Sequence, residues 1–157
     1  MKFKTFAIDF DDTITIGTKF PTIGELRPHA KRVMQRIKEN GGEIAIWTCR
    51  TGEHEVAVRE FLEENKIPFD SFNEILPCEK LLWGEGGRKI YADLYIDDHG
   101  VYAMMNGGID WLQIEDFIFA KKCGFCNGTG SLELVNDEDF KNNLKCVCTF
   151  CKGKGEI

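Results

Sequence analysis

The chain has 157 residues, of which 43% are hydrophobic, enough for one compact domain or one domain with a small appendage. Its formal net charge of −6 argues against a general nucleic-acid or membrane-binding surface, since such surfaces depend on clustered Lys and Arg. Acidic residues begin at Asp9, before the apolar region of a signal peptide could form, and no apolar run approaches the roughly 18 residues of a membrane span. These features predict a soluble, cytoplasmic protein without a membrane partner.

Apolar runs of strand length alternate along the chain with apolar residues at helical spacing. The elements that they predict are, in chain order, a strand over 3–9, a helix from Pro28 to the Gly41-Gly42 pair, a strand over 43–48, a helix over about 53–65, a weaker strand over 67–72, a strand over 94–96 and a helix opened by Asp110. The last helix is expected to bury Trp111, Leu112, Ile114, Phe117 and Ile118. The alternation predicts an α/β fold with a Rossmann-like parallel sheet and helices on both of its faces.

The composition changes near Lys121-Lys122, where a cysteine-rich tail begins. Of the 7 cysteines, only Cys49 and Cys78 precede this point. In a chain without a secretion signal, clustered C-x-x-C pairs indicate metal ligands rather than disulfides. We therefore predict one domain over residues 1–120 and a separate small module over residues 121–157.

Polar side chains follow three of the predicted strands at the point where each strand ends. They are Asp9, Asp11 and Thr13 after the first, Thr48 after the second, and Asp97 and Asp98 after the last. Because the carboxyl ends of parallel strands meet at one edge of a sheet, we expect these side chains to converge. Turn or cap residues explain any one of these strand ends equally well, but all three together favour a site.

Four carboxylates at one edge of a sheet repel one another unless a cation lies between them. A small number of oxygen ligands suits Mg²⁺, which keeps several waters and also binds substrate phosphate. A calcium-binding EF-hand loop is excluded, because Ile14 stands where that loop needs Gly and Phe20 where it needs Glu. The sequence therefore predicts a magnesium site formed by Asp9, Asp11, Asp97 and Asp98.

The strand-end residues resemble the motifs of the haloacid dehalogenase superfamily. Three motifs match in order: an apolar strand with D-x-D-x-T in Phe6–Thr13, a strand ending in Thr in Ile44–Thr48, and a strand ending in paired acids in Leu94–Asp98. Lys89 is the first candidate for the lysine motif, because it opens a K-x-x-A-D-x-x-I-D-D run similar to that of small capless hydrolases of the superfamily. Lys80 and Lys66 are alternatives. The resemblance covers about residues 3–120.

The resemblance implies a magnesium-dependent phosphatase that hydrolyses phosphate monoesters through an aspartyl-phosphate intermediate. Asp9 would attack phosphorus and split the hydrolysis into two easier steps. Asp11 would protonate the leaving oxygen and then activate the water that breaks the intermediate. The dehalogenases and ion-pumping ATPases of the superfamily lack an Asp at the position of Asp11, so its presence here favours a phosphatase.

The other motif residues would hold the substrate and the metal. Thr48 and Lys89 would bind the phosphoryl oxygens, and Thr13 would fix the loop. The ligands of Mg²⁺ would be the Asp9 carboxylate, the Asp11 backbone carbonyl and the carboxylate of Asp97 or Asp98. The neighbouring Arg50 is read equally well as a phosphate contact or as an ordinary surface residue, and Cys49 as a small turn residue rather than a nucleophile.

The spacing of the motifs bears on the substrate. Neither the gap from Thr13 to Glu43 nor the gap from Cys49 to Lys89 holds a cap domain of useful size. In members of the superfamily, cap domains choose the substrate, so an open site suits a phosphorylated macromolecule or another bulky phosphate ester. A small metabolite and an oligomeric lid stay open as alternatives.

The tail contains two copies of a C-x-x-C-x-G-x-G unit, similar to the zinc units of DnaJ-type co-chaperones. Two such pairs supply four thiolates, which predict one tetrahedral structural Zn²⁺ in a zinc-ribbon-like module. The predicted ligands are Cys123, Cys126, Cys148 and Cys151, with Cys146 as an alternative to Cys148 and a strand over 132–135 between the pairs. The module would either dock a protein or nucleic acid, or act as a stabilising clip.

Two other functions stay open at this point. The first is a phosphatase that processes nucleic-acid ends with the zinc module as its guide. The second is a binding protein, in which the hydrolase site is vestigial and the zinc module recognises partners.

Overall fold

A computed structural model describes residues 1, 3–83, 89–119, 131–134, 144–147 and 152. The chain divides into two compact units, Met1–Ile118 and Phe119–Ile157, so the division lies two residues before the predicted boundary at residue 120. The four predicted zinc ligands, Cys123, Cys126, Cys148 and Cys151, lie outside the described residues. In the described ranges, no helix is both long and apolar enough to cross a membrane.

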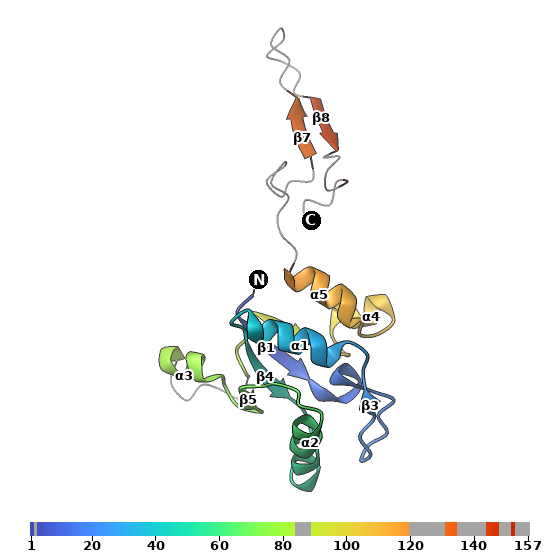
Figure 1. Cartoon of the computed structure of the whole chain (residues 1–157), viewed down its shortest axis with the longest axis vertical. Helices are drawn as coiled ribbons and strands as arrows, with labels where there is room; N and C mark the ends of the chain where they lie inside the picture. The colour runs from blue at the N-terminus through green and yellow to red at the C-terminus, as the bar shows by residue number, and fades with distance from the viewer. Residues whose placement is uncertain (2, 84–88, 120–130, 135–143, 148–151, 153–157) are drawn as a thin grey trace. The chain divides into compact units, whose positions relative to one another are not determined.

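The first unit is built on a four-stranded parallel sheet in the order β5-β4-β1-β6 (Figure 1). Its strands are β1 (Thr5–Asp9), β4 (Glu43–Trp47), β5 (Ser71–Phe72) and β6 (Leu94–Ile96). Each strand lies within a segment predicted as a strand, and helices flank the sheet. The predicted α/β class with a parallel sheet is therefore confirmed, and the arrangement is consistent with a Rossmann-like fold.

One face of the sheet carries large apolar side chains. Phe6 and Ile8 of β1 and Ile44 and Ile46 of β4 are fully buried there, as expected for near-continuous apolar strands of a parallel sheet. The long helices of this unit are α1 (Ala30–Glu39), α2 (Glu53–Glu64) and α5 (Trp111–Phe119). Helix α1 buries Ala30, Val33, Met34 and Ile37, whose spacing is that of one helical face.

A buried carboxylate joins α1 to α5. Glu115 of α5 is paired with Arg32 and Arg36 of α1, whose guanidinium groups donate to both of its carboxylate oxygens. Hydrogen bonds from Arg32, together with Arg36, lower the pKa of Glu115 against the effect of burial. Glu115 is therefore ionised at neutral pH, and its ion pairs with the two arginines hold α1 and α5 together.

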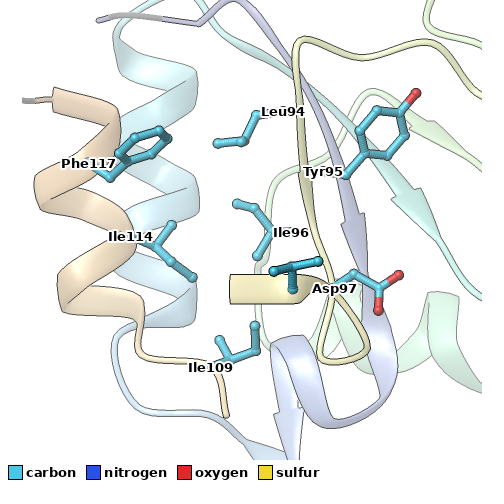
Figure 2. Close-up of a pocket in the computed structure, with 9 residues that line it drawn as sticks. Leu94, Tyr95, Ile96, Asp97, Ile109, Ile114 and Phe117 are labelled. Carbon is cyan, nitrogen blue, oxygen red and sulfur yellow. The ribbon is translucent and has the colours of Figure 1, made fainter. Parts of the chain in front are cut away.

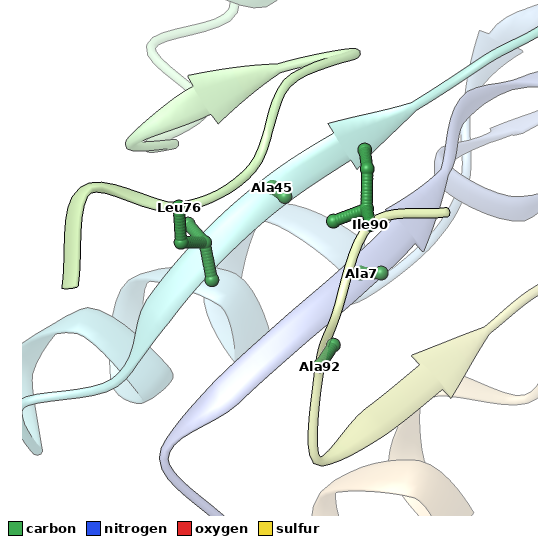
Figure 3. Packing of buried hydrophobic residues seen from close by; sticks show 5 residues of the cluster. All are labelled: Ala7, Ala45, Leu76, Ile90 and Ala92. Carbon is green, nitrogen blue, oxygen red and sulfur yellow. The ribbon is translucent and has the colours of Figure 1, made fainter. Parts of the chain in front are cut away.

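The opposite face of the sheet is lined by small residues. Ala7 of β1 and Ala45 of β4 pack against Leu76, Ile90 and Ala92, as Figure 3 shows. Cys78 of α3 (Pro77–Trp83) packs against the same cluster, so α3 lies on this face. The sequence predicted no element at this position, and with α3 there helices lie on both faces.

The prediction that α5 buries five residues is wrong for two of them. Leu112 and Phe117 of α5 are 45% and 46% exposed, whereas Trp111, Ile114 and Ile118 are buried as predicted. A helix at the outside of the sheet buries one stripe only, and the extra apolar residues of α5 fall beside that stripe. Helix α4 (Val101–Asn106) was not predicted, because six residues are too few to show a helical period.

The second unit contains an antiparallel hairpin of β7 (Ser131–Leu134) and β8 (Leu144–Val147), in which Leu132 lies opposite Cys146. Strand β7 overlaps the predicted strand over 132–135.

Candidate active site

The carboxyl ends of β4, β1 and β6 lie side by side at one edge of the sheet. Asp9 ends β1 opposite Trp47, the last residue of β4. On the other side, Ile8 lies opposite Ile96, so Asp97 follows β6 next to Asp9. The sheet order therefore brings together the strand ends that the sequence marked as polar.

Asp9 is partly buried, and its carboxyl group is crowded by other acids. Its pKa is raised from 3.8 to about 7, chiefly by burial, and the negative charges of Asp97 and Asp98 act in the same direction. Hydrogen bonds with the Thr13 hydroxyl and the Phe10 backbone oppose the rise. A nucleophilic carboxylate must be ionised, so Asp9 needs a nearby positive charge to work at neutral pH.

Asp11 lies in a loose helical turn, η1 (Phe10–Ile14), that leaves the end of β1. Asp11 itself is extended, and Asp12 has a φ of 52°, a left-handed conformation that Asp tolerates better than most residues. The turn directs the Asp11 carboxylate to Arg50, which donates from Nε to Oδ2 at 2.8 Å and from Nη2 to Oδ1 at 2.9 Å. Arg50 is 2% exposed, so it is not a surface residue.

Thr13 is fully buried and holds two strand ends together. Its Oγ1 accepts a hydrogen bond from the backbone N–H of Asp98 at 3.0 Å, and its carbonyl accepts one from Trp111 Nε1 at 3.0 Å. Thr13 also hydrogen-bonds to the Asp9 carboxyl. The predicted role of Thr13 in fixing the loop is consistent with these contacts.

Thr13→Val should lower the free energy of unfolding by about 1–3 kcal/mol, because Val keeps the shape but leaves the Asp98 N–H without its acceptor. It should also raise the pKa of Asp9 further, since the lost hydrogen bond lowers that pKa. Urea denaturation measures the first effect. Thr51→Val, at an exposed threonine, is the control and should change stability by less than about 0.5 kcal/mol. Equal stabilities of Thr13→Val and the parent would contradict this role.

Thr48 directly follows the neighbouring strand β4 and is buried. Its backbone N–H donates to Asn73 Oδ1 at 2.8 Å, and its hydroxyl oxygen accepts the Arg50 N–H at 3.2 Å. Among the described residues, no hydrogen bond uses the hydroxyl proton, which the predicted phosphate-binding role would need as a donor. Asn73 was missed from sequence, because it lies 25 residues away and only the pairing of β5 with β4 brings it near.

The three candidate lysines lie in different places. The Nζ of Lys89 lies 5.5 Å from the ring centroid of Tyr95, which pairs with Ala7, two residues before Asp9 on the same face. Lys80 forms an ion pair with Glu74 at 3.4 Å. It belongs to α3, whose Cys78 lies near Glu43 at the start of β4, the opposite edge of the sheet. Lys66 follows α2 in a turn with a φ of 53°. Lys89 is therefore the best placed, although the described contacts include none between it and Asp9.

The types of ligand atom at this edge of the sheet suit a magnesium ion. The donors are oxygens, and the crowding of Asp9 by Asp97 and Asp98 is relieved by a cation. Arg50 donates to both carboxylate oxygens of Asp11, which favours the Asp11 backbone carbonyl over its side chain as a metal ligand. In the part of the chain that the structure describes, no three His, Cys, Asp or Glu side chains are grouped as a ready metal cluster.

A cavity of about 310 Å³ lies beside this edge, between β6 and α5 (Figure 2). Leu94 and Ile96 of β6 face Ile114 and Phe117 of α5 across it, whereas the Asp97 carboxylate points away. The cavity is therefore mostly apolar, although Asp97 is among the residues that line it.

Comparisons with known proteins find a similar solved structure. No protein-family profile and no curated protein matches the chain. A solved structure of a conserved protein from Bacteroides thetaiotaomicron is 33% identical and aligns over 73% of this chain and 88% of its own, with a TM-score of 0.61. It is described only as a conserved protein, so it brings no activity to this chain.

Proposed function

This chain belongs to the same family as the conserved Bacteroides thetaiotaomicron protein, and we propose that it is a magnesium-dependent phosphatase acting on phosphate monoesters. The observation that carries the proposal is the position of Asp9 beside Asp97 and Asp98, with a pKa raised to about 7. The negative charges of Asp97 and Asp98 disfavour an ionised Asp9, and a bound cation would relieve this repulsion. The resemblance to the haloacid dehalogenase motifs supports the same reaction.

In the proposed reaction, an Asp9 oxygen forms a bond to phosphorus while the phosphorus–oxygen bond of the ester breaks. Asp11 gives its proton to the departing oxygen, so that the product leaves as an alcohol. Asp11 then takes a proton from water as the water oxygen attacks the same phosphorus. The second displacement releases inorganic phosphate and restores Asp9.

The remaining residues would bind and orient the phosphoryl group. Thr48 and Lys89 are its proposed ligands, and Thr13 keeps the two acidic strand ends in register. Bound Mg²⁺, held by Asp9, the Asp11 carbonyl and Asp97 or Asp98, would neutralise charge on the attacking carboxylate and on the phosphoryl oxygens.

The short connections around the site favour a bulky substrate. From Thr13 to Glu43 the described chain contains the hairpin β2 (Thr15–Ile16) and β3 (Glu25–Leu26) and the helix α1. From Cys49 to Lys89 the described residues form α2, β5 and α3. Since no cap domain appears in these described stretches, we propose that the substrate is a phosphorylated macromolecule or another large ester.

A panel of phosphomonoesters tests the proposal. It should contain phosphopeptides, 3′-phosphorylated oligonucleotides and small alcohol phosphates, each assayed for released phosphate with Mg²⁺ and with EDTA. We expect hydrolysis with Mg²⁺, its loss in EDTA and a preference for a macromolecular ester. A preference for the oligonucleotide would identify nucleic-acid ends as the substrate, whereas silence across the whole panel would leave a binding protein with a vestigial site.

For the second unit we propose a structural zinc site formed by Cys123, Cys126, Cys148 and Cys151. Two observations support it: the duplicated cysteine units in the sequence, and the β7–β8 hairpin that they flank. An isolated two-stranded hairpin is at best marginally stable in water, so it needs a further source of stability.

A further inference from the structure

The guanidinium group of Arg50 makes four hydrogen bonds to two different parts of the site. Two go to the carboxylate of Asp11, one to each oxygen, in the fork geometry that Arg and a carboxylate favour. The other two go to backbone carbonyls, from Nη1 to Pro21 at 2.7 Å and from Nη2 to Thr22 at 3.2 Å. Arg50 therefore links Asp11 to the tip of the β2–β3 hairpin.

The tip and the base of this hairpin are held by different arginines. At the base, Arg27 donates from Nε to the Thr15 carbonyl and from Nη2 to the Asp12 carbonyl. Gly24 allows the two strands to approach closely, because a Cβ there would lie 2.3 Å from the Ile16 carbonyl oxygen. The strands are only two residues each, and at the tip the backbone N–H of Thr22 donates to the Lys19 carbonyl. The contacts of Arg50 add two hydrogen bonds to this tip.

Arg50 is covered by the hairpin rather than open to a ligand. It is 2% exposed, and the Phe20 ring lies 5.3 Å from its guanidinium carbon. The Phe20 ring also packs edge-on against His54 of α2 at a centroid distance of 4.9 Å. The guanidinium group has five N–H donors, and four of them already donate within the protein. Substrate binding is therefore not its main role.

We infer that Arg50 is a positioning residue, which holds the Asp11 carboxylate and the hairpin tip as one unit. The inference rests on the proposed acid–base role of Asp11. A carboxylate has about four lone-pair sites and the fork uses two, which leaves sites on Asp11 for the transferred proton. Displacement of the hairpin would then misplace Asp11, and loss of the Asp11 carboxylate would loosen the hairpin.

Arg50→Lys and Asp11→Asn test the link in the full chain. A lysine has one ammonium group and cannot span the carboxylate and both carbonyls. We expect the amide hydrogens of residues 17–20 and 22–24 to exchange faster in both variants than in the parent. Arg59→Lys is the matched control, because Arg59 forms an arginine–carboxylate pair with Glu55 within α2, and it should leave this exchange unchanged. Unchanged hairpin exchange in both test variants would overturn the link.

Kinetics on a phosphomonoester then separate positioning from substrate binding. Arg50→Lys should lower kcat by about 10²-fold, the size of effect that a misplaced catalytic group produces, with little change in KM. In an Asp11→Asn background the same substitution should cost no further activity, because its effect passes through Asp11. If Arg50→Lys raised KM alone, or lowered the activity of the Asp11→Asn variant as much as it lowers that of the parent, Arg50 would instead be a substrate ligand. The exchange measurement needs no turnover, so it tests the link even if the proposed phosphatase activity fails.

Discussion

Asp9→Asn is expected to abolish phosphomonoester hydrolysis and, in the absence of divalent cations, to make the protein more stable than the parent at pH 8. The loss of activity follows from the loss of the nucleophile, since an amide oxygen does not form the aspartyl-phosphate. The gain in stability follows from burial and from the charges of Asp97 and Asp98, which disfavour an ionised Asp9.

The pH dependence of this gain follows from the raised pKa. The folded protein retains the Asp9 proton up to about pH 7, whereas the unfolded chain releases it near pH 4. The stability that Asp9 contributes is therefore fully present below about pH 4 and is lost as the pH rises through about 7. A rise from 3.8 to about 7 corresponds to about 4 kcal/mol at most, so Asp9→Asn should gain about 2–4 kcal/mol at pH 8 and nothing near pH 4.

Chemical denaturation in EDTA at pH 8, 6 and 4 measures this difference. Asp93→Asn is the matched control at the amino end of β6, where Asp93 accepts hydrogen bonds from the backbone N–H groups of Lys4 and Thr5. These bonds lower the pKa of Asp93, so its replacement should reduce stability above the ordinary pKa of Asp. Added Mg²⁺ should stabilise the parent more than Asp9→Asn. If Asp9→Asn hydrolysed the ester at the parent rate, the mechanism would be refuted. If it were no more stable than the parent at pH 8, burial and the neighbouring acids would not raise the pKa of Asp9 as described.

Removal of zinc is expected to unfold the β7–β8 hairpin and to leave the first unit, Met1–Ile118, folded. The hairpin has only two four-residue strands, and such a pair does not bury enough apolar surface to be stable alone. Four thiolates around Zn²⁺ supply about 10–16 kcal/mol of apparent binding free energy in small zinc domains. The metal would therefore decide whether the second unit folds.

Metal analysis and backbone NMR of the full chain test this expectation. We expect one zinc per chain, and loss of the hairpin signals with a chelator or in Cys126→Ser, while the signals of β1 and β4 persist. Cys146→Ser and Cys148→Ser decide which thiol is the fourth ligand. Cys49→Ser is the control, because Cys49 is an exposed thiol of the first unit. A hairpin that stays folded without metal would contradict the zinc site.

Much of the fold could be predicted from the sequence, because the signals were local. The apolar runs that end at Asp9 and Trp47 mark buried parallel strands, and the spacing of Val33, Met34 and Ile37 marks the buried face of a helix. The same reasoning failed for Leu112 and Phe117, because the apolar side of α5 is wider than the stripe that the sheet can cover.

The residue types of the candidate site could be predicted from the sequence, but the hydrogen bonds between its distant residues could not. The chemistry at the strand ends follows from the types and spacing of Asp9, Asp11 and Asp97, which the sequence states directly. A partner distant in sequence leaves no such pattern: Arg50 is 39 residues from Asp11, and Asn73 is 25 residues from Thr48.

The sequence by itself therefore determined the class of fold, the sheet edge of the candidate site and the acidic residues at it, because periodicity and strand-end residue types are local properties. Only the tertiary structure decided that the side chain of Asp11 faces Arg50, and that burial and neighbouring acids raise the pKa of Asp9. Burial and charge depend on which strands and loops lie side by side in space. That arrangement is set by the order β5-β4-β1-β6 and by the hairpin that covers Arg50.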